Sequence, residues 1–167
     1  MLTQRKSRLG WKVDVEFKTS SVHGTGVFAR RAIKAGTRVW QFDSSMQVCD
    51  SKTLPGLPPH EITYALHAGY LHEPSGKFLY YTDGMQWLNH GSGSIANVGL
   101  NYWPSRLRDD HLVALRDIAA GEELREDYTF CLEGGLGPDH WMRPLYLQYC
   151  PSHLEFLLGL ERQKVAA

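Results

Sequence analysis

The sequence predicts a mainly β protein with a few short helices. Short segments in which apolar and polar residues alternate dominate the chain, and Gly, Pro, Asn or Asp stands near their ends. Only two segments have the spacing of apolar residues that is typical of a helix. The length of 167 residues fits one domain, and no internal repeat or linker interrupts it, so we expect a single domain over residues 1–167.

The predicted strands follow one another along most of the chain. In residues 11–17, Trp11, Val13, Val15 and Phe17 fall on one face and charged residues on the other, as in a half-buried strand. The same alternation predicts strands over residues 27–29, 37–42, 77–82, 98–103 and 111–116. Residues 115–128 read as the end of a strand, a glycine turn and a second short strand.

Two helices complete the predicted elements. Pro59 suits the first turn of a helix that runs to about residue 71, in which Ile62 and Leu66 are four residues apart. Ser152 and Glu155 have the spacing of a capping box, which predicts that a second helix begins at Ser152.

Composition excludes several classes of protein. The three cysteines, Cys49, Cys131 and Cys150, are too few and too irregularly placed for a disulfide framework or, with His140 and His153, for a zinc site. No stretch approaches the ~20 apolar residues of a membrane helix, and the start of the chain does not resemble a signal segment. We therefore expect a cytoplasmic protein, or a nuclear one in a eukaryote, with no metal and no membrane partner.

The formal net charge of zero conceals an uneven distribution. The first 38 residues carry nine basic and two acidic side chains, a net charge of +7, so the remainder carries −7. Acidic residues are densest between Asp117 and Glu133. Both charged regions can be ordinary solvated faces, and the neutral total argues against a general nucleic-acid binder.

Three stretches have a pattern that can carry chemistry, and the first contains Gly24 and Gly26. With Ala29 and the later Asp43 it fits the dinucleotide-binding pattern G-x-G-x-x-A. The context disagrees, because the preceding strand alternates and only about eight residues separate residue 28 from the next strand, too few for a crossover helix. Two interpretations remain: a plain tight turn, or bare backbone against which a ligand lies.

The second stretch contains Asn89 and His90, which follow Trp87 and enter a loop rich in Gly and Ser. It can be a hydrogen-bonded corner, or a pocket in which the Asn amide contacts a heteroaromatic base. The third stretch is residues 115–128, which ends at Tyr128; a strand, a glycine turn and a second short strand explain most of it without chemistry. A tyrosine in such a place is more often a core residue than a catalytic one.

Taken together and in this order, the three stretches resemble a SET domain, the family of protein-lysine methyltransferases that use S-adenosylmethionine. Residues 23–29 resemble its opening G-x-G motif, residues 88–98 its Asn-His motif, and residues 116–128 closely match its closing motif. The resemblance implies a SET-type β-clip fold of small curved sheets with a C-terminal pseudoknot. It covers about residues 13–130, which leaves residues 131–167 as a C-terminal lid or packing segment.

The resemblance also implies roles for individual residues. Tyr128 is expected to be the catalytic residue, at the place of methyl transfer. Phe42 stands where many relatives have an active-site tyrosine, and Glu126 where relatives often have an aromatic residue lining the lysine channel, so both are candidate substrate-binding residues. Glu126 can alternatively face water if the strand end is shifted. The residues implied in cofactor binding are His23, Gly24, Thr25, Gly26, Asn89 and His90.

The expected function is methyl transfer from S-adenosylmethionine to a lysine ε-amine of a protein, with S-adenosylhomocysteine as the product. The acidic stretch that ends beyond Tyr128 favours a basic protein substrate through long-range attraction. Two alternatives stay open. Phe42, Glu126 and the altered Asn-His loop are compatible with a SET-like binding module that has lost turnover, and the short chain is compatible with a methyltransferase for a small amine.

Overall fold

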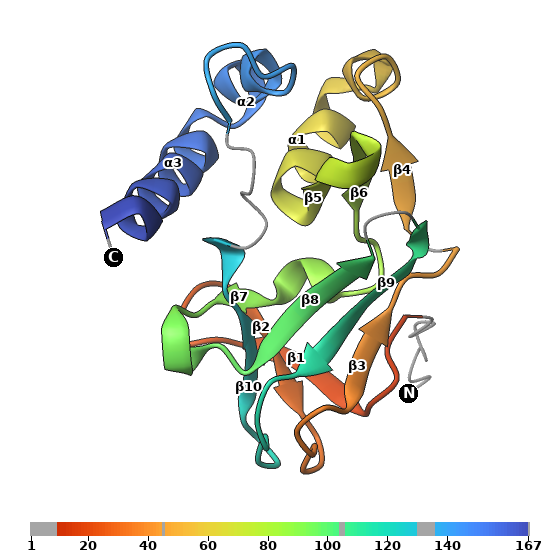
Figure 1. Ribbon diagram of the computed structural model, residues 1–167, viewed down its shortest axis with the longest axis vertical. Helices are drawn as coiled ribbons and strands as arrows, with labels where there is room; N and C mark the ends of the chain where they lie inside the picture. The colour runs from red at the N-terminus through yellow and green to blue at the C-terminus, as the bar shows by residue number, and fades with distance from the viewer. Residues whose placement is uncertain (1–9, 45, 104–105, 130–135, 167) are drawn as a thin grey trace. The chain divides into compact units, whose positions relative to one another are not determined.

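We describe the protein from a computed structural model that places residues 10–44, 46–103, 106–129 and 136–166 (Figure 1). The chain forms two compact units, and each is assembled from two separate segments. Unit 1 comprises residues 1–46 and 81–127, and unit 2 comprises residues 47–80 and 128–167. Strands far outnumber helices among the described residues, so the prediction of a mainly β protein with few short helices is confirmed. The single domain over residues 1–167 stays a prediction.

Unit 1 is built around a curled seven-stranded sheet. Six of its strands follow one another in the order β1-β2-β10-β8-β9-β3, and the short strand β7 pairs with β10 outside this path. Their bounds are Val15–Thr19 for β1, Thr25–Ala29 for β2, Arg38–Gln41 for β3, Asn89–His90 for β7, Val98–Trp103 for β8, Arg106–Ala114 for β9 and Glu123–Glu126 for β10.

The sequence forms these strands because alternate side chains enter a common core. In β2, Val27 and Ala29 are fully buried while Phe28 between them is half-buried. Trp40 of β3 is fully buried, and its indole N–H donates to the Asp83 carboxylate over 2.6 Å, which satisfies the indole's only donor. Other side chains at or near zero exposure in this core are Val15, Val39, Leu112, Ile118 and Leu124.

Strand β10 is the element that gathers the three sequence motifs. It pairs antiparallel with β2, which carries the G-x-G residues, and parallel with β7, which carries Asn89 and His90. Its last residue, Glu126, also pairs with Val98 of β8. The closing motif therefore lies between the other two, as a central strand with neighbours on both sides.

Unit 2 combines a three-stranded sheet with three α-helices. The strands have the order β4-β6-β5, with β4 at Gln47–Cys49, β5 at Gly69–His72 and β6 at Lys77–Tyr80. The helices are α1 at Pro59–Ala68, α2 at Arg143–Tyr149 and α3 at Pro151–Ala166. Their apolar side chains form one core, which includes Leu54, Ile62, Leu66, Phe78, Met142, Tyr146 and Leu154. Among the described residues, no helix is both long and apolar enough to cross a bilayer.

Two helix predictions need correction. Helix α1 begins at Pro59 as expected but ends at Ala68, because residues 69–72 form β5 and pair with β6. Gly69 permits this pairing, since a β-carbon there would overlap the carbonyl oxygen of Leu79. Helix α3 begins at Pro151, one residue before the expected N-cap, so Ser152 lies in its first turn. The last segment also contains α2, which was not predicted.

Candidate functional site

The G-x-G residues span the end of the turn between β1 and β2 and the start of β2, and each glycine is explained by a different observation. Gly24 has φ = +50°, a left-handed conformation that favours glycine, and its carbonyl accepts a hydrogen bond from Ser20 N over 2.9 Å. Gly26 lies against Glu123, and a β-carbon at Gly26 would overlap Oε1 of that side chain. Because β2 pairs antiparallel with both β1 and β10, no βαβ unit surrounds these glycines, and the dinucleotide-binding interpretation is wrong.

The side chain of Asn89 ties this turn to the Asn-His strand. Its Nδ2 donates to Glu123 Oε1 over 2.9 Å, and lies 3.2 Å from the carbonyl oxygen of His23 and 3.3 Å from that of Thr25. All three partners are acceptors, so they fix which end of the amide carries the nitrogen. Asn89 is 8% exposed, and its two N–H groups are shared among the carbonyls of the turn and the carboxylate.

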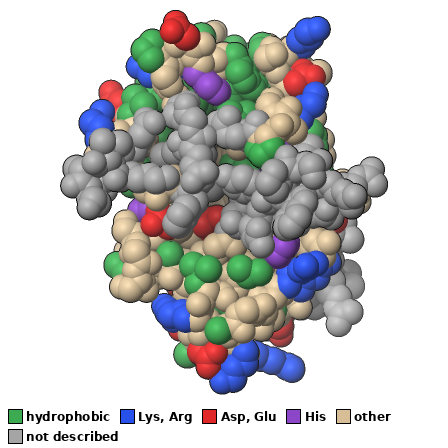
Figure 2. Space-filling view, in the orientation of Figure 1, with side chains coloured by type: hydrophobic (Ala, Val, Ile, Leu, Met, Phe, Trp, Pro, Cys, Tyr) green, Lys and Arg blue, Asp and Glu red, His purple; other side chains and the backbone are tan. Residues whose placement is uncertain are grey.

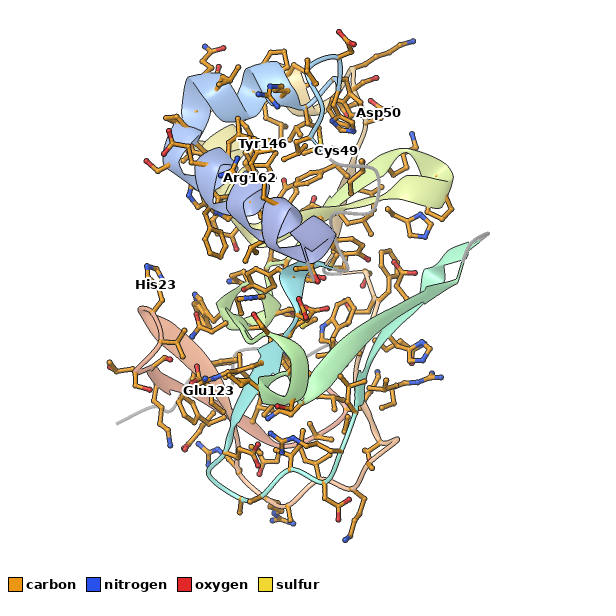
Figure 3. All side chains as sticks on the ribbon, turned by 60° about the vertical axis from the view of Figure 1, so that its left-hand side comes forward. His23, Cys49, Asp50, Glu123, Tyr146 and Arg162 are labelled. Carbon is orange, nitrogen blue, oxygen red and sulfur yellow. The ribbon has the colours of Figure 1, made fainter. Side chains whose placement is uncertain are left out.

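Glu123 is the buried acid of this cluster, and it lies within the sheet while the His23 side chain projects from the turn (Figure 3). Its Oε2 accepts from Arg125, over 2.9 Å from Nη2 and 3.3 Å from Nε. Burial acts to raise the pKa of Glu123, but hydrogen bonds from Ser20, Asn89 and Arg125 outweigh it and hold the pKa below its ordinary value. The carboxylate is therefore ionised at neutral pH and available to Asn89 as a strong acceptor.

His90 continues the strand that Asn89 begins. It stands opposite Glu126 in the parallel pairing with β10, and the amide of Gly91 donates to the carbonyl of Glu126 over 3.0 Å. His90 is half-buried, and its Nε2 lies 2.9 Å from Oγ of Ser92. The main chain of His90 is thus fixed beside β10. It is this main chain to which the family resemblance assigns cofactor binding.

Asn97 braces the other side of β10. Its Nδ2 donates to Glu122 Oε1 over 2.9 Å and to the carbonyl of Glu123 over 2.8 Å, and its Oδ1 accepts from Arg125 N over 2.9 Å. The side chain is 1% exposed. Its amide bonds to main-chain groups of β10 much as a neighbouring strand would, so its role in this structure is to hold β10 in place.

The remaining predicted site residues are Phe42, Glu126 and Tyr128. Phe42 follows β3, at the far end of the strand order from β1, and its amide donates to the carbonyl of Asp110 over 2.8 Å. Glu126 is 6% exposed, so the interpretation in which it faces water is wrong. Tyr128 is half-buried, two residues beyond the end of β10, and is the first residue of the second segment of unit 2. The roles of Phe42, Glu126 and Tyr128 stay predictions.

The acidic stretch is more neutral than its sequence indicates. Asp117 lies 2.7 Å from Lys34 Nζ, Glu122 lies 2.7 Å from Arg116 Nη2, and Glu123 is bonded to Arg125. Figure 2 shows Lys or Arg side chains beside Asp or Glu side chains at the lower end of the visible face, in agreement with this pairing. A basic substrate stays a prediction, but Asp117, Glu122 and Glu123 give it little support. Glu133 and Cys131 lie outside the described residues.

Sequence reasoning missed two residues that organise the site, Glu123 and Arg125. In the sequence they are two charged residues among many in the closing motif, residues 116–128. The signal that identifies Glu123 is the contact with Gly26, which becomes visible only when β10 is known to pair with β2. Among the described residues, no group of three or more His, Cys, Asp or Glu side chains is arranged to hold a metal ion.

Comparison with known proteins agrees with this geometry. A family model of the SET domain matches residues 24–129, which is more than half of the chain, and the protein belongs to the SET domain family. The matched residues include the G-x-G turn, the Asn-His strand and the whole of β10. The family resemblance noted from the sequence is therefore confirmed.

Solved structures show the same fold. The Neurospora SET domain protein DIM-5, a histone lysine methyltransferase, superposes with a TM-score of 0.52 and 19% identity, over 71% of this chain and 53% of that chain. A humanized mutant of the Chaetomium thermophilum Polycomb Repressive Complex 2 gives a TM-score of 0.55 and 20% identity, over 78% of this chain and 16% of that chain. A search of curated proteins finds no significant match. The predicted SET-type fold is confirmed, and this chain spans only part of both neighbours.

Proposed function

We propose that this protein is an S-adenosylmethionine-dependent methyltransferase that acts on a lysine ε-amine of a protein substrate. The observation that carries the proposal is the meeting of the three motif segments at Asn89. This one side chain contacts the carbonyls of the G-x-G turn and the carboxylate of Glu123 on β10. The cluster holds together the segments to which the family resemblance assigns cofactor binding.

The residues of the cluster fit S-adenosylmethionine. A β-carbon at Gly24 would meet no atom within 4 Å, so the backbone of the turn is open to a ligand there. The candidate cofactor-binding residues are the main chain of His23, Gly24, Thr25 and Gly26, the side chain of Asn89 and the main chain of His90. When bound, the cofactor supplies a methyl group on a sulfonium whose positive charge also lowers the pKa of a nearby ammonium.

The task of this chain is then to align the methyl donor with a neutral amine, and not covalent catalysis. Methyl transfer is an in-line displacement, so fixed placement of donor and acceptor provides most of the acceleration. A free lysine has a pKa of about 10.4, so only about one amine in 2,500 is neutral and nucleophilic at pH 7. Tyr128 is the candidate catalytic residue: its hydroxyl orients the neutral amine, and it need not remove the proton itself.

A second candidate function is a SET-like module that binds the cofactor but has lost turnover. Two observations favour it. Phe42 lacks the hydroxyl that a tyrosine would provide, and Glu126 is a buried carboxylate two residues before Tyr128. A carboxylate close to the target amine would stabilise its ammonium form, which opposes methyl transfer.

The test measures transfer of a radiolabelled methyl group with wild-type protein and Tyr128→Phe. The substrates are core histones, a lysate of basic proteins and a panel of free small amines. We expect labelling of protein by the wild type and a loss of about 100-fold in kcat for the variant, since misplacing a reacting group by about 1 Å costs about 10²-fold. Equal labelling by the two proteins would remove Tyr128 from the mechanism.

Calorimetry with S-adenosylhomocysteine separates the candidates. Binding together with labelling of protein supports the lysine methyltransferase, and binding with no labelling of any substrate supports the inactive module. Labelling of free amines alone would identify a small-amine methyltransferase instead. If the wild-type protein does not bind S-adenosylhomocysteine, all three of these cofactor-dependent functions are wrong.

A further inference from the structure

The backbone conformation of Gly26 does not require glycine. The described glycines with positive φ are Gly24, Gly36, Gly76, Gly84, Gly93 and Gly121, and Gly26 is not among them. Its place in the register of β2, opposite Lys18 of β1, is that of an ordinary strand residue. Any requirement for glycine at this position must therefore come from what approaches its α-carbon.

The group that approaches is the carboxylate of Glu123. A β-carbon at Gly26 would overlap Oε1 of Glu123 and lie 3.0 Å from its Cδ and from Cβ of Ser20. The carboxylate cannot simply turn away, because Asn89 holds Oε1 and Arg125 holds Oε2. A methyl group at residue 26 and the carboxylate at residue 123 thus compete for the same space.

Glu123 also determines how Asn89 is oriented. Its Oε1 is a charged acceptor at 2.9 Å from Asn89 Nδ2, whereas the two carbonyls of the turn lie farther away, at 3.2 and 3.3 Å. A hydrogen bond to an ionised acceptor is roughly twice as strong as one to a neutral acceptor. Without the carboxylate, the buried Asn89 amide keeps only its two weaker partners.

We infer that Glu123 is a positioning residue for the cofactor site, which orients Asn89 against the G-x-G turn and imposes glycine at position 26. The inference rests on the proposed function, because it concerns the site to which we assign S-adenosylmethionine. It assigns the second glycine of the motif to a contact within the protein, and the first glycine to the conformation of the turn. Glu123 acts through Asn89 and Gly26, and not on the reacting atoms.

A double-mutant cycle tests the inference with S-adenosylhomocysteine as the probe. The variants are Gly26→Ala, Glu123→Ala and the double variant, and the dissociation constant of each is measured by calorimetry. We expect each single variant to bind about tenfold more weakly and the double variant to lose about tenfold, not a hundredfold, because removing the carboxylate makes room for the new methyl group. A loss of about a hundredfold in the double variant would overturn the inference.

The matched control is Gly24→Ala, alone and combined with Glu123→Ala. Gly24 has no neighbour within 4 Å of a new β-carbon, so Ala acts there through the backbone. Glu123→Ala cannot relieve that strain, and the two losses are expected to multiply. If Glu123→Ala rescued Gly24→Ala as well, the effect would not be specific to Gly26 and the inference would fail.

Two further measurements separate positioning from general loss of structure. For Glu123→Ala we expect KM for S-adenosylmethionine to rise about tenfold while kcat at saturation changes less than twofold. Glu123→Gln keeps the shape of the side chain and one acceptor oxygen, so we expect it to restore most of the affinity. A fall in kcat at unchanged KM would contradict this role. The same double-mutant cycle is also measured by urea denaturation without ligand. It tests the contact between residues 26 and 123 even if the wild type does not bind S-adenosylhomocysteine. Absence of that binding would overturn the proposed function, and not the contact.

Discussion

Replacing Asn97 by alanine removes a fully buried brace of the central strand. The wild-type side chain makes three hydrogen bonds, to Glu122 Oε1, to the carbonyl of Glu123 and from the amide of Arg125. Each such bond contributes about 1 kcal/mol net, so we expect Asn97→Ala to lower the free energy of unfolding by about 3 kcal/mol. The main-chain bonds of residue 97, to Arg125 O and from Leu115 N, remain in the variant.

Urea denaturation followed by tryptophan fluorescence measures this change, because four of the five tryptophans belong to unit 1. Hydrogen exchange supplies a local readout: the amide of Arg125 loses its acceptor, Oδ1 of Asn97, and should lose most of its protection. Thr19→Ala, at an exposed position of β1, serves as the control and should change stability by less than about 0.5 kcal/mol. A loss below about 1 kcal/mol for Asn97→Ala, with normal protection at Arg125, would refute the reasoning.

Two other predictions concern the two units separately. In unit 2, burial and then the nearby His67, whose ring centroid is 4.7 Å away, lower the pKa of His153 to about 4. The folded state therefore holds His153 neutral, so this group costs no stability above pH 6.5, and the free energy of unfolding falls by about 3 kcal/mol as the pH falls from 6.5 to 4. Urea midpoints at several pH values should fall less steeply in His153→Gln, and an identical slope would contradict the prediction. In unit 1, Gly84 has φ = +101° and a β-carbon there would lie 2.7 and 3.0 Å from carbons of the Phe17 ring, so Gly84→Ala should destabilise by about 2 kcal/mol or more. A thermal melt that matches the wild type would show that Phe17 moves aside freely.

The sequence could predict those elements whose patterning is local. Alternation located β8 at residues 98–103, and the order of the motifs identified the family. Local patterning could not show that the helix from Pro59 stops at Ala68, since Tyr70 keeps the helical spacing and only the partner strand β6 makes residues 69–72 a strand. Helix α2 has Pro144 in its first turn and is only 7 residues long, so its apolar residues looked like a packing segment.

In the candidate site, too, local motifs could be predicted and long-range contacts could not. His23, Gly24, Thr25, Gly26, Asn89 and His90 could be named from motifs, and the structure links the turn to Asn89. The part played by Glu123 could not be predicted, because it depends on β10 lying beside both β2 and β7, residues far apart in the chain. For the same reason the sequence overstated the negative charge of residues 117–126: Lys34 is 83 positions from Asp117, yet their side chains form an ion pair.

The assembly of each unit from two separated segments has a consequence for synthesis on the ribosome. Phe78 and Leu66 leave the ribosome early, but Met142, Tyr146 and Leu154, which complete the core around them, emerge more than 60 positions after Phe78. At ~5–20 residues per second, that interval is on the order of 3 to 13 seconds. Throughout it, apolar side chains of residues 47–80 have no helices α2 and α3 to cover them. The nascent chain is therefore expected to be most vulnerable to aggregation, and most in need of a chaperone, before helices α2 and α3 are made.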